Sequence, residues 1–94
     1  MSSVYVTRLP EKFDFSCHKK FNDETGAALK DEAVSVISLD FSVVSYLDSA
    51  ALGMIVYLHK KAAAVNKKVQ IRNVQGTARE ILDVANINKL VDVQ

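Results

Sequence analysis

Cys17, His18, Ser49 and His59 are the residues of this chain that most resemble catalytic or metal-binding groups. Ser49 and His59 lie ten residues apart in one predicted helix, which separates them by about 15 Å of rise. A nucleophile and its base need a hydrogen bond of about 2.6–3.2 Å, so this pair is excluded. Cys17 and His18 are neighbours that point about 100° apart on a helix. The Cys and His spacing does not match a zinc site. We therefore predict a protein that is not an enzyme and holds no cofactor.

Composition excludes several other classes. The chain has 94 residues, a net charge of +1 and isolated glycines, Gly26, Gly53 and Gly76. The near-zero charge argues against a nucleic-acid binder, and the lone glycines argue against the phosphate loop of a nucleotide-binding module. No apolar run approaches the roughly 20 residues of a membrane-spanning helix, and the first residues lack the features of a signal peptide. We expect a single cytoplasmic domain over residues 1–94, monomeric or weakly dimeric and without membrane insertion.

Strand and helix patterns alternate along the chain. Residues 33–41 are apolar at positions of both parities, which is typical of a central strand in a parallel sheet. Pro10 ends the first strand, Ser16 is a candidate cap for the first helix, and residues 77–80 match a capping box. We predict strands at residues 4–9, 12–15, 33–41, 68–74 and 90–93, and helices after Ser16, from Asp48 or Ser49 to about 65, and from 77 to about 85. This order indicates an α/β fold with helical crossovers.

The loop after the central strand ends at the start of the second helix. Either Asp48 or Ser49 is its N-cap, and in both cases the Ser49 hydroxyl lies at a helix N-terminus. The free N–H groups and the positive dipole end there stabilise an added anion by about 0.3–1 kcal/mol. A phosphoserine carries about −1.5 to −2 charges. The fold is therefore expected to tolerate a phosphate at Ser49, whereas a partner docked at this edge is not.

Residues 38–53, SLDFSVVSYLDSAALG, resemble the signature of STAS domains (sulphate transporter and anti-sigma factor antagonist). The resemblance is greatest to the stand-alone bacterial anti-sigma factor antagonists. It implies a STAS fold with a small mixed sheet of four to five strands and helices packed mainly on one face. It also implies that Ser49 is the phosphoacceptor, that Asp48 is the adjacent family aspartate, and that Asp14 is an acidic residue of an earlier loop at the same edge. Ala50 and Ala51 replace the hydroxyl residue and glycine common in the family, so Ser49 is the sole acceptor.

The resemblance implies a partner-switching regulator of transcription. The unphosphorylated domain binds an anti-sigma factor, often itself the serine kinase, and thereby releases a sigma factor. Phosphorylation at Ser49 blocks this binding, and a PP2C-type phosphatase restores it. The partner-binding residues expected from the motif and its surroundings are Asp14, Asp48, Ser49, Ala50, Leu52 and Met54. The alternative is a STAS subunit of a lipid ABC transporter that uses the same loop as a fixed contact without phosphorylation.

Overall fold

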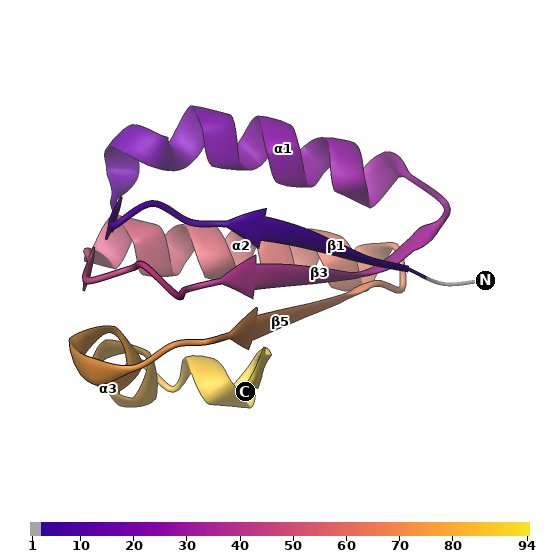
Figure 1. The fold of residues 1–94 in the computed structure, drawn as a ribbon. Coiled ribbons are helices and arrows are strands. Elements are labelled where there is room, and N and C mark those ends of the chain that lie inside the picture. Colours follow the sequence, from indigo (N-terminus) through magenta and orange to yellow (C-terminus); the bar gives the residue numbers. More distant parts are fainter. Residues whose placement is uncertain (1–2) are drawn as a thin grey trace.

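A parallel four-stranded sheet forms the centre of the computed structural model, which describes residues 3–94 (Figure 1). Its order is β1-β3-β5-β6, with bounds Ser3–Arg8, Val34–Asp40, Lys68–Arg72 and Asp92–Val93. Two short strands, β2 (Lys12–Phe13) and β4 (Tyr46–Leu47), pair in a second sheet. The helices are α1 (His18–Lys30), α2 (Ser49–Ala64) and α3 (Gly76–Val84), with 3-10 turns η1 (Phe15–Cys17) and η2 (Ile87–Lys89).

The α/β class and the helix-covered face confirm the expected fold, but the sheet is parallel rather than mixed. Each pairing within residues 3–94 is parallel. The physical reason is that a helix separates each strand of the large sheet from the next one along the chain, and such a crossover returns the chain to the same sheet end. The element order therefore dictates the strand direction.

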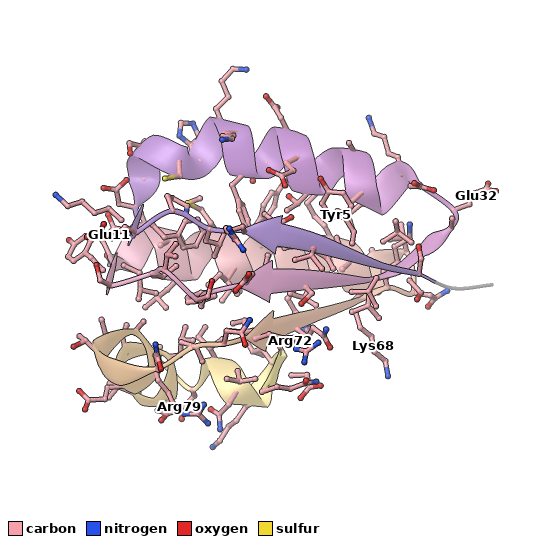
Figure 2. The ribbon with its side chains drawn as sticks, viewed as in Figure 1. Tyr5, Glu11, Glu32, Lys68, Arg72 and Arg79 are labelled. Carbon is pink, nitrogen blue, oxygen red and sulfur yellow. The ribbon has the colours of Figure 1, made fainter. Side chains whose placement is uncertain are left out.

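The two faces of the sheet differ in exposure. On one face, the alternate residues Ile37 and Leu39 of β3 are fully buried in the layer of α1 and α2. On the other face, Val4 and Val6 of β1 remain 53% and 59% exposed. Figure 2 shows the side chains of Lys68 and Arg72 projecting from β5, and both residues are exposed. The expectation that helices pack mainly on one face is thus met.

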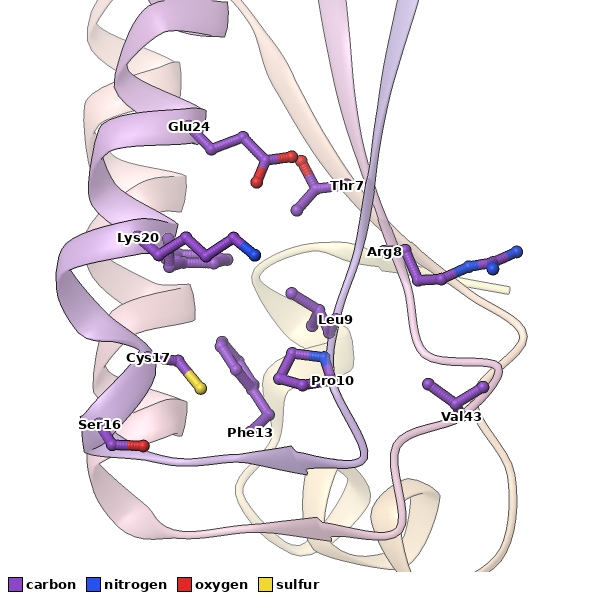
Figure 3. Close-up of a pocket in the computed structure, with 11 residues that line it drawn as sticks. Thr7, Arg8, Leu9, Pro10, Phe13, Ser16, Cys17, Lys20, Glu24 and Val43 are labelled. Atoms are coloured by element: carbon purple, nitrogen blue, oxygen red, sulfur yellow. The ribbon is translucent and has the colours of Figure 1, made fainter.

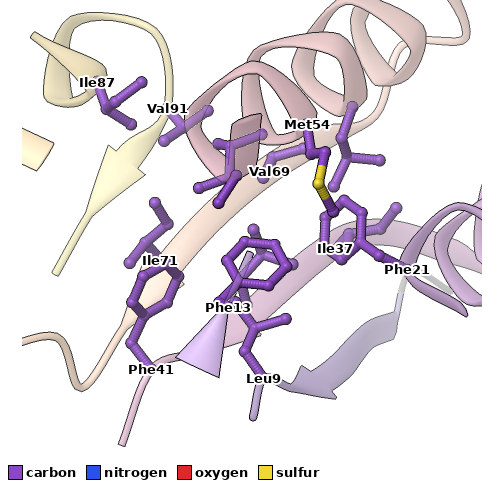
Figure 4. Packing of buried hydrophobic residues seen from close by; sticks show 14 of the residues in the cluster. Leu9, Phe13, Phe21, Ile37, Phe41, Met54, Val69, Ile71, Ile87 and Val91 are labelled. Atoms are coloured by element: carbon purple, nitrogen blue, oxygen red, sulfur yellow. The ribbon is translucent and has the colours of Figure 1, made fainter. Parts of the chain in front are cut away.

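Phe13 anchors the loop that carries Asp14. Its side chain is fully buried, with its ring centroid 5.2 Å from that of Phe21 and 6.3 Å from that of Phe41. Figure 4 shows these rings converging with Ile37 and Ile71 in the hydrophobic cluster. Burying an aromatic ring in a close-packed interior contributes several kcal/mol, so a strand of only two residues is held firmly in place.

Two predicted helix caps are wrong. Asp14 is the N-cap of the 3-10 turn η1, and its carboxylate accepts hydrogen bonds from the N–H and the hydroxyl of Ser16. Helix α1 begins only at His18, two residues after Ser16. Ser16 is therefore inside the 3-10 turn instead of capping α1. The third helix begins at Gly76, one residue earlier than predicted. Gly76 has a φ of +61°, and the N-cap Gln75 makes no side-chain cap bond. Thr77 already lies within the helix, so the predicted capping box does not form.

Three predicted strands are two residues shorter than expected at one end. The strand predicted at residues 12–15 ends at Phe13, because Phe15 already lies in η1. The strand predicted at residues 68–74 ends at Arg72 because Asn73 takes a φ of +63°, outside the β region. The strand predicted at 90–93 begins only at Asp92, since Leu90 and Val91 still donate backbone hydrogen bonds to the Ile87 carbonyl of η2. The long helix, in contrast, runs from 49 to 64 almost as predicted.

Candidate functional site

Asp48 is the N-cap of α2 and Ser49 is its first residue. The Asp48 backbone is extended, and its carboxylate accepts a hydrogen bond of 2.8 Å from the N–H of Ala51. This geometry decides between the two caps that the sequence left open. Ser49 is exposed, so its hydroxyl is open to solvent at the positive end of a sixteen-residue helix.

The pairing of β2 with β4 brings Asp14 to the same edge. Phe13 pairs with Leu47, and Asp14 and Asp48 are the residues that follow this pair on the two parallel strands. Asp14 is half-buried and its carboxylate bonds to Ser16. The structure therefore places Asp14 beside the start of α2, and its carboxylate orders the neighbouring loop.

A third aspartate orders the loop that leads to Ser49. Asp40 ends β3, and its Oδ1 accepts hydrogen bonds from the Ser42 N–H (2.9 Å) and the Asn73 side-chain amide (3.1 Å), while Oδ2 lies 3.7 Å from Arg8 Nε. The Asn73 hydrogen bond, then the Ser42 N–H, lower the pKa of Asp40 below its usual value. Sequence analysis did not single out this cluster. Its local part is an Asx turn, which an aspartate two residues before a serine in a turn can signal.

Of the three apolar residues expected to contact a partner, Met54 lies in the hydrophobic core. Met54 is 8% exposed and belongs to the hydrophobic cluster, with its side chain directed into the core in Figure 4. The expectation that Met54 presents surface to a partner is therefore wrong, because it shares a helix face with the buried Ala51 and Leu58. Ala50 and Leu52 are half-buried.

Three exposed apolar side chains on the surrounding loops were missed by sequence reasoning. Phe15, Val43 and Tyr46 are 60%, 50% and 51% exposed. Phe15 stacks on the imidazole of His18, with ring centroids 4.3 Å apart. The alternation of Tyr46 with the buried Leu47 is a period-two signal that marks Tyr46 as outward-facing. Phe15 lies in the turn before α1, and Val43 and Tyr46 lie in the segment before α2, so both approaches to these helices carry apolar surface that a partner can cover.

The site combines an exposed hydroxyl with an ordered backbone. The first N–H groups of an α-helix have no backbone partner within the helix. In α2 the Asp48 carboxylate accepts the hydrogen bond of the Ala51 N–H, and the N–H groups before it remain available. An anion attached to Ser49 lies close to these groups and to the helix dipole.

Within residues 3–94, no group of three His, Cys, Asp or Glu side chains is arranged to hold a metal ion. None of the helices described there has the length and apolar character to cross a membrane.

Comparisons with known proteins give one family. Residues 2–94 match the STAS domain. A STAS-domain containing protein of Pseudomonas aeruginosa (strain UCBPP-PA14) is 30% identical over 86 residues, which cover 87% of this chain and 79% of that protein.

Solved structures show the same fold at low identity. SpoIIAA, an anti-sigma factor antagonist, in its unphosphorylated form has a TM-score of 0.71 at 22% identity, covering 88% of this chain and 76% of its own. The Bacillus cell fate determinant SpoIIAA in its phosphorylated form has a TM-score of 0.74 at 19% identity, covering 100% and 85%. A sulfate transporter family protein of Wolinella succinogenes reaches 0.78 at 12% identity, covering 95% and 73%. The match along residues 2–94 and the relative in Pseudomonas establish that the chain belongs to the STAS domain family.

Proposed function

We propose that this STAS domain is a phosphorylation-controlled partner-switching regulator in bacterial transcription, an anti-sigma factor antagonist. The unphosphorylated domain binds an anti-sigma factor that also acts as its serine kinase, phosphorylation of Ser49 ends that binding, and a PP2C-type phosphatase restores it. The domain acts in the cytoplasm as kinase substrate and binder. The observation that carries the proposal is the exposed Ser49 hydroxyl, first in α2 and directly after the N-cap Asp48.

Electrostatics support a switch that leaves the fold unchanged. A phosphoryl group on Ser49 adds about −1.5 to −2 charges at neutral pH. In the free domain, solvent and the first-turn N–H groups stabilise this charge by about 0.3–1 kcal/mol. In a complex the same charge is taken out of water next to the carboxylates of Asp14 and Asp48. Each 1.4 kcal/mol of that penalty weakens binding about tenfold.

The proposed contact surface surrounds Ser49. Its polar members are Asp14, Asp48 and Ser49, and its apolar members are Ala50 and Leu52 of α2. The exposed side chains of Phe15, Val43 and Tyr46 extend it. Exposed aromatic side chains are common anchors of protein–protein interfaces, whereas the buried Met54 is left out of this surface.

Mass spectrometry of the protein purified from its native cells tests the modification. We expect a species heavier by one phosphoryl group, mapped to Ser49 by peptide sequencing and absent from the Ser49→Ala variant. Ser45→Ala is the matched control, because Ser45 is an exposed serine of the loop that leads to α2 and its loss leaves the species unchanged. A phosphate on another residue, retained in Ser49→Ala, contradicts the proposal.

Co-purification separates the proposed function from the transporter alternative. With wild-type protein as bait, we expect a serine kinase or anti-sigma factor that is lost when Ser49 is phosphorylated. Recovery of the ATPase subunit of a transporter, equally well with wild type and Ser49→Asp, would establish the alternative, a fixed contact without phosphorylation.

A further inference from the structure

A cavity of about 520 Å³ lies between β1 and the first half of α1. Figure 3 shows its two walls: Thr7, Leu9 and Pro10 on the strand side, and Cys17, Lys20 and Glu24 on the helix side, with Phe13 at one end. Cavities of this size with mostly apolar walls and a few convergent polar groups are typical of small-molecule sites. This cavity is separate from the hydroxyl of Ser49, which does not line it.

Thr7 supplies a polar atom that lacks a partner. The residue is 2% exposed, and its Oγ1 has no hydrogen-bond partner among residues 3–94. In Figure 3 the Thr7 side chain points from β1 toward α1, on the side where Glu24 reaches across. Buried side-chain hydroxyls are nearly always bonded, and an unbonded one costs free energy. This hydroxyl is therefore placed to bond a molecule that enters the cavity.

Lys20 and Glu24 carry opposite charges on the same face of α1, yet they form no ion pair in the described structure. The adjacent pair Lys19 and Asp23, with the same spacing, does so at 3.1 Å. Figure 3 shows Lys20 and Glu24 directed across the cavity toward β1. Glu24 Oε1 accepts a hydrogen bond of 3.2 Å from the Tyr5 hydroxyl, which leaves its second oxygen available.

The polar and apolar parts of the cavity lie at opposite ends. Lys20, Glu24 and Thr7 lie toward one end, and Leu9, Pro10, Phe13 and Cys17 lie toward the other, with the Ser16 hydroxyl beyond Cys17. Arg8 also borders the cavity, but in Figure 3 its guanidinium points away. The charged groups that face the space are thus one cation and one anion. A ligand with a single charge would pair with only one of the two, whereas a zwitterion with an apolar tail pairs with both.

We propose that this cavity binds an α-amino acid with an apolar side chain. The ligand carboxylate pairs with the Lys20 ammonium, and the ligand ammonium pairs with the free oxygen of Glu24. The Thr7 hydroxyl donates to the ligand carboxylate, and the apolar side chain occupies the end formed by Leu9, Phe13 and Cys17. This inference is independent of the function proposed for Ser49.

Titration of the ¹⁵N-labelled protein with L-leucine, L-methionine and L-phenylalanine tests the proposal. We expect saturable shifts of the Thr7, Lys20 and Glu24 amide signals with at least one of the three. Hexanoate and hexylamine, which carry one charge each, should bind at least about tenfold more weakly, because each lacks one charge-assisted hydrogen bond. The absence of saturable shifts with all three amino acids, or equal binding of hexanoate, would overturn the proposal.

Variants of the polar groups make the test specific. Thr7→Val should weaken amino-acid binding by about two- to tenfold, the effect of one neutral hydrogen bond, while raising the thermal midpoint of the free protein because an unbonded hydroxyl is removed. Lys20→Met and Glu24→Gln should each weaken binding about tenfold or more. The matched controls Lys19→Met and Asp23→Asn alter the adjacent pair and should leave binding unchanged. Unchanged affinity in Thr7→Val, or equal losses in the controls, would contradict the site.

Discussion

The two ends of the sheet are held by opposite charges. At the carboxyl end of the strands, three aspartates accept backbone N–H groups: Asp14 from Ser16, Asp40 from Ser42, and Asp48 from Ala51. At the amino end, the ammonium of Lys67 donates to the carbonyls of Ala28, Leu29 and Asp31 at the end of α1, at 3.4, 2.8 and 2.6 Å. Carboxylates thus cap a helix N-terminus at one end, and a cation caps a helix C-terminus at the other.

The difference lies in what each end leaves available. The Lys67 ammonium, with three bonds, can make few further contacts, because –NH3⁺ has three donors. At the carboxyl end the aspartates order the backbone and leave the Ser49 hydroxyl exposed on a fixed helix terminus. An ordered backbone with an accessible side chain suits modification and recognition. The amino end therefore contributes to stability alone, whereas the carboxyl end combines stabilising aspartates with the exposed hydroxyl of the proposed switch.

Lys67→Met tests the structural role of the amino end and has the largest expected effect. Three carbonyls of α1 lose their cationic donor, so we expect the free energy of unfolding to fall by about 1–2 kcal/mol. Urea denaturation followed by circular dichroism measures this loss, and partner binding should be unchanged. Lys68→Met is the matched control at the next position, where an exposed side chain should matter by about 0.5 kcal/mol or less. Equal losses in the two variants would remove the structural assignment of Lys67.

Ser49→Asp tests the proposed role of the carboxyl end. We expect the complex with the captured partner to weaken about tenfold or more, equivalent to about 1.4 kcal/mol, while the thermal midpoint stays nearly constant. Titration calorimetry gives the affinity. Ser49→Asn is the control, since asparagine has the shape of aspartate without its charge and should weaken binding less. Wild-type affinity in Ser49→Asp would show that charge at this position does not govern binding.

Asp48→Ala should affect both the stability of the domain and its partner binding, and it tests whether binding at the carboxyl end requires an ordered start of α2. Loss of the N-cap bond to Ala51 should lower the free energy of unfolding by about 1 kcal/mol and weaken partner binding as well. Asp48→Asn keeps a capping side chain and should restore most of the stability. A stable Asp48→Ala variant would mean that the cap does not order the start of α2.

Local signals in the sequence predicted the parts of the molecule that depend on neighbours along the chain. Asp48 before a long apolar run predicted the start of α2, and strand and helix periods predicted the element order. Met54 shows where motif reasoning was weaker than periodicity: it lies three residues after Ala51 and four before Leu58, a spacing that predicts burial on the same face.

Contacts between distant residues escaped prediction for a physical reason. Lys67 reaches carbonyls 36 to 39 positions away, and Asn73 reaches Asp40 across 33 positions. No spacing rule links such residues, because the sheet register brings them together. The same holds for the cavity between β1 and α1, whose polar groups Thr7, Lys20 and Glu24 come from two elements.

Asp40→Asn tests how much one carboxylate stabilises the carboxyl end of the strands, and it has the smallest expected effect. The folded pKa of Asp40 lies below its unfolded value because the Asn73 amide and the Ser42 N–H bond to the carboxylate. This stabilisation is complete above the unfolded pKa of about 3.9 and is lost as the pH falls through the lower folded pKa. Asn retains an acceptor for Ser42 but loses the charge, so we expect a loss of about 0.5–1 kcal/mol at pH 7. Urea denaturation at pH 7 and at pH 2.5 should show this difference shrinking in acid. If wild type and Asp40→Asn lose equal free energy of unfolding between pH 7 and pH 2.5, the carboxylate charge of Asp40 does not stabilise the carboxyl end.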